Sequence, residues 1–306
     1  MQSSLSATPL PEATHTTGPI LTLGTFDGVH MGHEHLLAAA REWAQAEGTG
    51  VEVWVFHPHP RAILQGESPP LLTTLEERLF LLRAQAERVR VIPFTPELAK
   101  LSAEAFLTEW IQKQASPRGI IVGYDHRFGR GREGSADFLR QRGIPVRQVP
   151  PYRAEGEIVS SSRIRKALAA GAVAEAQRLL GYPYTVRGLV QPGRGIARTL
   201  GTPTANLAFP PEKIRPPAGT YAGYASLSPL PLPLREGEAA LLYLSPEGVL
   251  EVHFLHGTSQ PLYGALLAAA FLHFLRPFTP IDSPAVLKAQ IQTDLEAAHR
   301  FFQQKS

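Results

Sequence analysis

The chain of 306 residues contains no cysteine, which excludes disulfide bonds and metal sites built on thiolates. Its charges nearly balance, with 30 Lys and Arg against 27 Asp and Glu, and a nucleic-acid binder normally has a far larger basic excess. No apolar run approaches the ~20 residues of a membrane helix, and residues 1–19 lack the pattern of a signal peptide. We therefore expect a cytoplasmic protein that binds neither nucleic acid nor membrane.

Proline, by contrast, is abundant: the chain has 28, about 9% where ~5% is usual. The hydrophobic fraction of 43% excludes a disordered chain. The length predicts about two domains, each able to bury a core. Nothing in the composition predicts the oligomeric state.

The first half alternates β-prone runs with helical patterns, which predicts a parallel sheet wrapped by helices. Ligands of such sheets bind in the loops at the carboxyl ends of the strands. We expect strands at residues 20–23, 51–56, 89–94, 119–123 and 146–149, and helices at 34–47, 75–88, 102–114 and 135–142.

The second half changes character after a predicted helix at residues 161–180. Short β-like segments separated by Gly and Pro then predict a small antiparallel barrel or sandwich, and a helix follows at 283–302. Residues 262–274 fit either a strand or a buried helix. We place the boundary at the glycine and proline near 181–183, giving domains 1–182 and 183–306. The expected strands are 185–190, 220–226, 239–244 and 249–255.

The first motif with chemical content is GTFDGVHMGH at residues 24–33, between a predicted strand and a predicted helix. Gly28 and Gly32 allow the backbone to approach a phosphate, and the following helix N-terminus favours an anion. His30 and His33 can face one ligand and stabilise charge on phosphate oxygens.

Two other interpretations of this motif stay open at this point. The residues could serve only as turn and cap residues. Alternatively, His30, His33, His35, His57 and His59 could bind zinc, although no H-E-x-x-H spacing is present.

Several ordered motifs resemble those of the bacterial bifunctional riboflavin kinase/FMN adenylyltransferases, often called FAD synthetases. The resemblance implies a Rossmann-like nucleotidyltransferase domain that transfers AMP from ATP to FMN, giving FAD and pyrophosphate. It also implies a six-stranded riboflavin kinase-like barrel with a C-terminal helix, which phosphorylates riboflavin with ATP and Mg²⁺. The matching stretches are GTFDGVHMGHEHLL, VFHPHPRAIL, LTTLEERLFLL, FTPELAKLSAEAFLTEW, VGYDHRFGRGREG, IVSSSRIRKALAAG, VRGLVQPGRGIARTLGTPTANL and PAGTYAGYA.

For adenylyl transfer, the resemblance implies that His30 and His33 hold the ATP phosphates and stabilise the transition state. The family's S-S-T-x-x-R phosphate motif matches residues 160–165, with serine in place of threonine. Hydroxyls at a helix start and a forked arginine suit an anion, although simple N-capping is the alternative for the serines. The residues implied to bind ATP or its phosphates are Gly24, Phe26, Gly32, Ser160, Ser161, Ser162 and Arg165.

On the flavin side, the resemblance implies that Asp125 lies near the FMN phosphate and that the loop with His57 shapes the FMN site. A surface ion pair for Asp125 and a turn role for His57 are the alternatives. The family usually has Phe where this chain has His126.

In the kinase domain, the resemblance implies ATP and Mg²⁺ binding by Gly193, Gly195, Thr204 and Asn206, the latter two through hard oxygen donors to the metal. It assigns Glu251 as the catalytic base for the riboflavin hydroxyl. The alternative for Glu251 is a solvent-facing strand residue. On a strand, its side chain shares a face with His253, while Val252 points the other way.

The kinase domain also departs from the family pattern. Ala197 replaces a usual glycine, no G-x-x-P-T-F segment precedes the Glu251 strand, and residues 256–264 lack the two usual carboxylates. These departures motivate an alternative in which only FMN adenylyltransferase activity remains and the barrel is a flavin-binding or structural module. A nucleotidyltransferase with another acceptor and a flavin-sensing regulator are more distant alternatives.

Overall fold

The structure is a computed structural model that describes residues 18–191, 204–227, 236–258 and 262–305. The chain forms two compact units, and each of them is discontinuous in sequence. Unit 1 comprises Met1–Thr25, Glu34–Ser68 and Gln85–Pro151, and unit 2 comprises Phe26–His33, Pro69–Ala84 and Tyr152–Ser306. The boundary expected between residues 182 and 183 stays a prediction.

Unit 1 contains the predicted parallel sheet, with strand order β3-β2-β1-β4-β5. Its central strands are buried along nearly their whole length because both faces of the sheet are covered. The carboxyl ends of β2, β1 and β4 lie at one edge, since all three are parallel neighbours. The strands are β1 (Ile20–Gly24), β2 (Val51–His57), β3 (Arg88–Pro93), β4 (Gly119–Gly123) and β5 (Val146–Val149).

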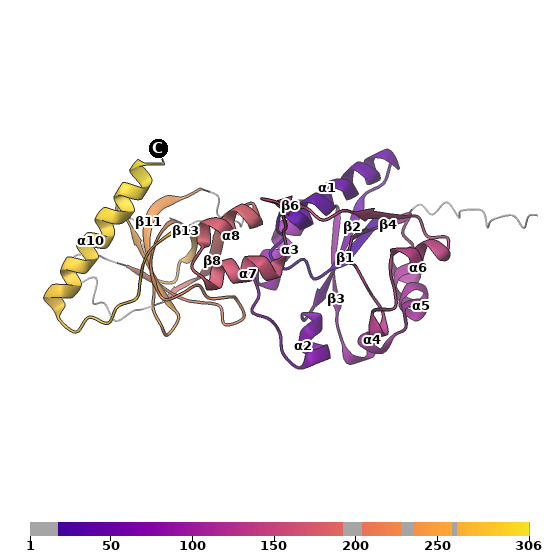
Figure 1. The fold of residues 1–306 in the computed structure, drawn as a ribbon, viewed down its shortest axis with the longest axis horizontal. Helices are drawn as coiled ribbons and strands as arrows, with labels where there is room; N and C mark the ends of the chain where they lie inside the picture. The colour runs from indigo at the N-terminus through magenta and orange to yellow at the C-terminus, as the bar shows by residue number, and fades with distance from the viewer. Residues whose placement is uncertain (1–17, 192–203, 228–235, 259–261, 306) are drawn as a thin grey trace, which may run out of the picture. The chain divides into compact units, whose positions relative to one another are not determined.

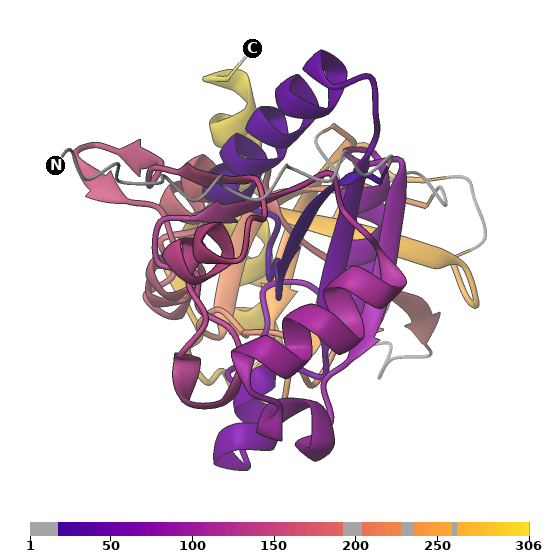
Figure 2. The same ribbon diagram turned by 90° about the vertical axis from the view of Figure 1, so that its right-hand side faces the viewer.

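Helices cover both faces of this sheet (Figure 1; Figure 2 gives the view turned by 90°). On one face, Trp43 of α1 (Met31–Ala46) packs so close to β4 that a Cβ on Gly119 would lie 2.3 Å from its ring. On the other face, the cluster around Phe106 joins β1, β2 and β4 to the helical turns after Ser102. Ser102 and Ser135 are the N-caps, as their hydroxyls predict. These turns are α5 (Ala103–Ala105), a π-helix η1 (Phe106–Gln112) and α6 (Ala136–Gln141).

Shorter elements complete the region before the barrel. The expected helix at 75–88 ends at Arg83, because Arg88 already pairs with Glu52 in the sheet. The other short elements are α2 (Pro60–Gln65), α3 (Leu75–Arg83), α4 (Pro96–Lys100), η2 (Arg130–Arg132), β6 (Arg153–Ala154) and β7 (Glu157–Ile158).

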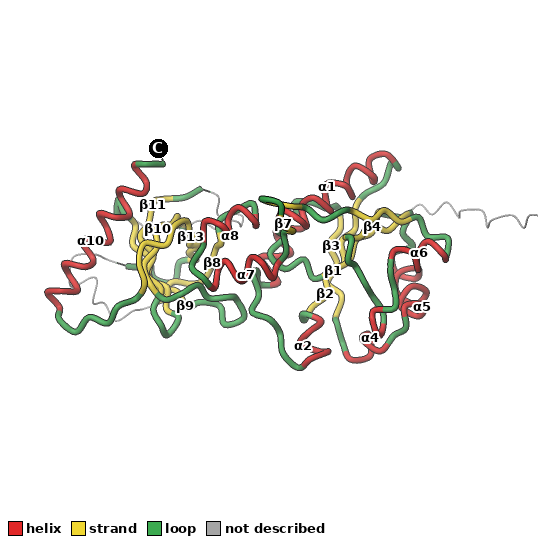
Figure 3. Tube along the Cα trace, in the orientation of Figure 1, coloured by secondary structure: helices red, strands yellow, loops and turns green. Residues whose placement is uncertain are grey.

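Unit 2 contains the predicted antiparallel structure as a closed barrel, in the order β10-β11-β12-β9-β8-β13 (Figure 3). Alternating apolar side chains fill its interior. The ambiguous segment 262–274 is a strand, and a short strand that the pattern did not predict, β9, completes the barrel. The strands are β8 (Tyr184–Gln191), β9 (Ala205–Ala208), β10 (Gly219–Ser226), β11 (Glu238–Leu244), β12 (Val249–Phe254) and β13 (Leu266–Pro277).

Three helices pack on this barrel. The single helix expected at 161–180 is wrong: α7 (Ser161–Ala169) and α8 (Val173–Leu180) are separate, because Gly171 adopts φ +75° and stops the first. The last helix, α10 (Pro284–Gln303), lies against β10 and β11 through Ala298. No helix within the described ranges combines the length and the apolar character that a membrane crossing needs.

Candidate active sites

The loop from β1 into α1 has the tight backbone that its glycines predict. Gly28 adopts φ +83°, and a Cβ there would lie 2.7 Å from Leu72, so only glycine fits. Phe26 and Val29 also have positive φ, at 50° and 33°. Such strained residues cluster at ligand-binding turns. The backbone N–H of Gly28 is held by the Thr73 hydroxyl at 3.0 Å.

His30 and His33 lie side by side in this loop, with stacked rings whose centroids are 3.8 Å apart. Burial lowers the pKa of His30 to about 4 and that of His33 well below its usual value, so both are neutral at pH 7. The Nδ1 atoms of both are buried without a hydrogen-bond partner among the described residues. Buried polar atoms without partners are rare, so two of them in adjacent side chains indicate a ligand-binding site.

The start of α7 belongs to the same unit and lies against this loop. Ser160 is the N-cap, accepting from the N–H of Arg163 at 3.3 Å, whereas Ser162 is exposed. The Ser161 hydroxyl donates to the carbonyl of Asp27 at 3.0 Å, and Arg165 Nη2 lies 2.5 Å from Asp27 Oδ2. The structure thus brings His30, His33, Ser161 and Arg165 together, while N-capping already occupies Ser160.

Asp27 is a residue that our sequence analysis missed. Its carboxylate is 1% exposed and accepts from the N–H groups of Leu72 and Thr73, at 3.0 and 3.2 Å. It also pairs with Arg78 at 3.3 Å, a guanidinium equally buried. No sequence signal separates this aspartate from an ordinary turn residue, because its partners are about 45 to 138 positions away.

His57 and Asp125 lie in unit 1, at the edge where the sheet's strands end. His57 closes β2, and Asp125 follows β4 directly after Gly123 and Tyr124. This edge is where ligands of parallel sheets bind. The zinc alternative gains no support, because no cluster of three potential ligands occurs among the described residues.

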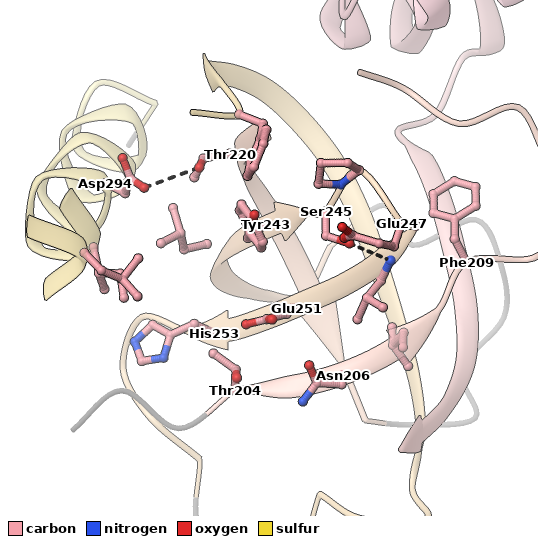
Figure 4. Close-up of a pocket in the computed structure, with 18 of the residues that line it drawn as sticks. Thr204, Asn206, Phe209, Thr220, Tyr243, Ser245, Glu247, Glu251, His253 and Asp294 are labelled. Atoms are coloured by element: carbon pink, nitrogen blue, oxygen red, sulfur yellow. Dashed lines mark hydrogen bonds between the residues drawn. The ribbon is translucent and has the colours of Figure 1, made fainter. Parts of the chain in front are cut away.

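A cavity of about 910 Å³ lies between the outer face of the barrel and α10. Glu251 and His253 of β12, Asn206 of β9 and Thr204, the residue before β9, direct their side chains into it (Figure 4). The buried Val252 points the other way, as the strand periodicity predicts. Gly193 and Gly195, expected to bind ATP here, lie outside the described residues.

Glu251 occupies the middle of a row of side chains across three strands. It pairs in register with Asn206 of β9 on one side and with Tyr243 of β11 on the other. Burial raises the pKa of Tyr243, and the negative charges of Glu251 and Glu247 raise it further. Tyr243 therefore stays neutral and can donate a hydrogen bond beside the carboxylate.

The sequence analysis also missed the far wall of this cavity, which comes from α10. Asp294 accepts from Arg276 at both oxygens, each at 2.7 Å, and from the Thr220 hydroxyl at 3.3 Å. Ile291 and Leu295 flank it on the cavity side. No sequence signal pointed to this wall, because the burial of Asp294 appears only in the fold.

A helix-covered parallel sheet joined to a closed six-stranded barrel fits the class of transferase that the motifs predicted. Family models agree: the FAD synthetase model matches residues 12–163 and the riboflavin kinase model matches residues 180–302. The chain belongs to the family of bifunctional riboflavin kinase/FMN adenylyltransferases, as the motifs predicted.

Curated relatives of that name match along nearly the whole chain. The protein of Escherichia coli (strain K12) is 33% identical over 93% of each chain, and that of Bacillus subtilis (strain 168) is 30% identical over 92% of each. A crystal structure titled macrolide-efflux protein from Streptococcus pneumoniae is also similar. It has a TM-score of 0.81 and 28% identity, covering 93% of this chain and 95% of that one.

Proposed function

We propose that this protein phosphorylates riboflavin to FMN and then transfers AMP from ATP to FMN, giving FAD and pyrophosphate. The observation that carries the proposal is the presence, in one described chain, of two separate polar sets. One joins His30, His33 and Arg165, and the other places Glu251 and Asn206 in the cavity beside the barrel. The alternative with adenylyl transfer alone is not favoured, because both family models match.

For adenylyl transfer, an FMN phosphate oxygen attacks the α-phosphorus of ATP and pyrophosphate leaves. No covalent nucleophile is needed, so the protein contributes positioning and charge stabilisation. Because burial keeps His30 and His33 neutral, they act as hydrogen-bond donors rather than as cations. Arg165 supplies the positive charge, and Gly24, Phe26, Gly32 and the serines 160–162 form the surrounding phosphate loop. His57 and Asp125 contact the flavin.

For the kinase step, the Glu251 carboxylate accepts the proton of the riboflavin 5′-hydroxyl. The oxygen then attacks the γ-phosphorus of ATP, and ADP leaves. The hydroxyl of Thr204 and the side-chain carbonyl of Asn206 face the same cavity, and such oxygen donors fit Mg²⁺. Bound there, Mg²⁺ would neutralise charge on the ATP phosphates. The resemblance also assigns ATP binding to Gly193 and Gly195, which lie outside the described residues.

The substrates are therefore small molecules, with ATP as co-substrate of both steps, rather than nucleic acid or lipid. We propose that the protein acts in the cytoplasm, where its co-substrate ATP is abundant.

Product analysis tests the proposal directly. Purified protein is incubated with ATP and Mg²⁺ and either riboflavin or FMN, and the flavins are separated. We expect FMN and FAD from riboflavin, and FAD from FMN. FAD from FMN without any product from riboflavin would contradict the kinase step, and the reverse would contradict adenylyl transfer. His33→Ala and Glu251→Gln each serve as the control for the other, because each should remove one step only.

A further inference from the structure

Asp27 lies in the loop between β1 and α1 and bonds to the two other segments of unit 2, Pro69–Ala84 and Tyr152–Ser306. Its carboxylate meets Arg165 of α7 and Arg78 of α3, and its backbone carbonyl accepts from Ser161. The exposed fractions of the three charged side chains are 1% for Asp27, 1% for Arg78 and 15% for Arg165. Arg165 is thus the only member of the cluster that a ligand can reach.

The bonds of Arg165 fix its plane while leaving donors for a ligand. Its Nε donates to the carbonyl of Pro70 at 2.7 Å, and its Nη2 donates to Asp27 at 2.5 Å. A guanidinium has five N–H groups, so three remain without an intramolecular bond to any described residue. Two of them are on Nη1 and one is on Nη2, and together they form one side of the forked guanidinium group. That side matches the oxygens of a phosphate.

The charges of the cluster point the same way. One buried carboxylate bonds to two guanidinium groups. Arg78 also bonds to the carbonyl and hydroxyl of Thr73, and its side chain is buried. Arg165 is the more exposed of the two, and its positive charge is felt at His30, whose Nδ1 has no hydrogen-bond partner among the described residues.

We propose that Asp27 is a positioning residue for the triphosphate of ATP, acting through Arg165. It does not touch the substrate; it neutralises Arg78, orients the guanidinium of Arg165 and, through Ser161, keeps the start of α7 in register with the histidine loop. The proposal rests on adenylyl transfer as the proposed function.

A double-mutant cycle of Asp27→Asn and Arg165→Ala tests this role. Two quantities are measured in each variant: the affinity for inorganic tripolyphosphate, by calorimetry, and the KM for ATP in FAD formation. Arg165→Ala should weaken tripolyphosphate binding about tenfold, which is the loss of one charged contact. Asp27→Asn should weaken tripolyphosphate binding by the same factor. The variant with both substitutions should bind tripolyphosphate no more weakly than either single variant. The KM for ATP should rise by a similar factor in these variants, while the KM for FMN should remain unchanged. A general loosening of the fold would raise both KM values.

Riboflavin phosphorylation is the folding control, because the barrel belongs to the same compact unit and should be active in every variant. Where Asp27→Asn loses this activity too, Asp27→Asn combined with Arg78→Met removes both members of the buried pair. That variant should recover the kinase and still bind tripolyphosphate weakly.

Several results would overturn the proposal. One is a tripolyphosphate affinity equal to that of the unmodified protein in Asp27→Asn, or in Asp27→Asn combined with Arg78→Met. A second is a loss of affinity in Asp27→Asn combined with Arg165→Ala that equals the product of the two single losses. A third is that the unmodified protein does not bind tripolyphosphate. Failure of the proposed function is distinguishable: it appears as no FAD from FMN, while the tripolyphosphate cycle still decides the role of Asp27.

Discussion

Glu251 on β12 lies directly opposite Asn206 on β9, so that a carboxylate and an amide face the cavity beside the barrel from one register position. This pairing puts the carboxylate that we propose as proton acceptor beside the amide oxygen that we propose as a Mg²⁺ ligand.

Replacing Glu251 by glutamine should remove the proton acceptor while preserving shape. We expect FMN formation from riboflavin to fall about 10²- to 10⁴-fold, with FAD formation from supplied FMN unchanged. Rates of the two steps, measured separately, give the answer. Glu238→Gln, the same change at an exposed position where β11 begins, is the matched control. Ordinary kinase rates in Glu251→Gln would rule out this role.

Asp294 fixes α10 as the far wall of the kinase cavity. Asp294→Asn should leave Arg276 without its bidentate partner and destabilise the protein by about 1–3 kcal/mol. Because the wall loosens, we expect a higher KM for riboflavin and an unchanged KM for FMN in FAD formation. Urea unfolding and steady-state kinetics measure both effects. Glu296→Gln, on the exposed side of α10, should change neither, and a riboflavin KM that stays constant in Asp294→Asn would contradict the prediction.

The buried neutral histidines should make the fold sensitive to acid. Burial lowers the pKa of His30 from 6.5 to about 4, so the unfolded chain binds this proton first as the pH falls. The stabilisation is therefore complete above pH 6.5 and is lost progressively toward pH 4, by about 3 kcal/mol for His30. Urea unfolding at a series of pH values should show this slope. It should be smaller in His30→Gln and unaltered in His256→Gln, an exposed site; equal slopes in all three proteins would refute it.

His126 occupies a position where the resemblance implies phenylalanine. Burial lowers its pKa to about 4, and its Nε2 has no hydrogen-bond partner among the described residues. Since a buried unsatisfied group costs about 1–3 kcal/mol, His126→Phe should stabilise the protein by about 1 kcal/mol and reduce its acid sensitivity. Thermal unfolding at pH 7 and pH 5 measures both, with the exposed Tyr124→Phe as the control. A destabilised His126→Phe would show that the imidazole is needed where it is.

The sequence predicted most of the architecture because its elements carry strong periodic patterns. The alternation of β-prone runs such as 119–123 with helical patterns indicated a parallel sheet wrapped by helices. The strand β9 escaped prediction because its four residues, Ala205–Ala208, are too few for a period to show. The break at Gly171 escaped because a single glycine is tolerated within a helical pattern, and only the positive φ reveals it.

The residues of the candidate sites also fall into two groups, those that the sequence could indicate and those that it could not. Residues within short motifs, such as His30 and Glu251, could be found because their neighbours in sequence carry the pattern. Asp27 and Asp294 could not, because each acquires its role from guanidinium groups distant in the chain or on another element. Local propensity contains no information about such partners, which only the fold brings within reach.

The discontinuity of unit 2 has a consequence for separating the two activities. A fragment ending at residue 182 would lose Lys213 and Ile214, which bond to Glu77 and to the backbone of Leu71. Those contacts hold the segment that in turn supports Asp27. Severing the chain there would expose a buried carboxylate at Glu77 and release the scaffold of the phosphate loop. We therefore expect a cut after residue 182 to weaken the support of Asp27, so that the two proposed activities do not separate cleanly at that position.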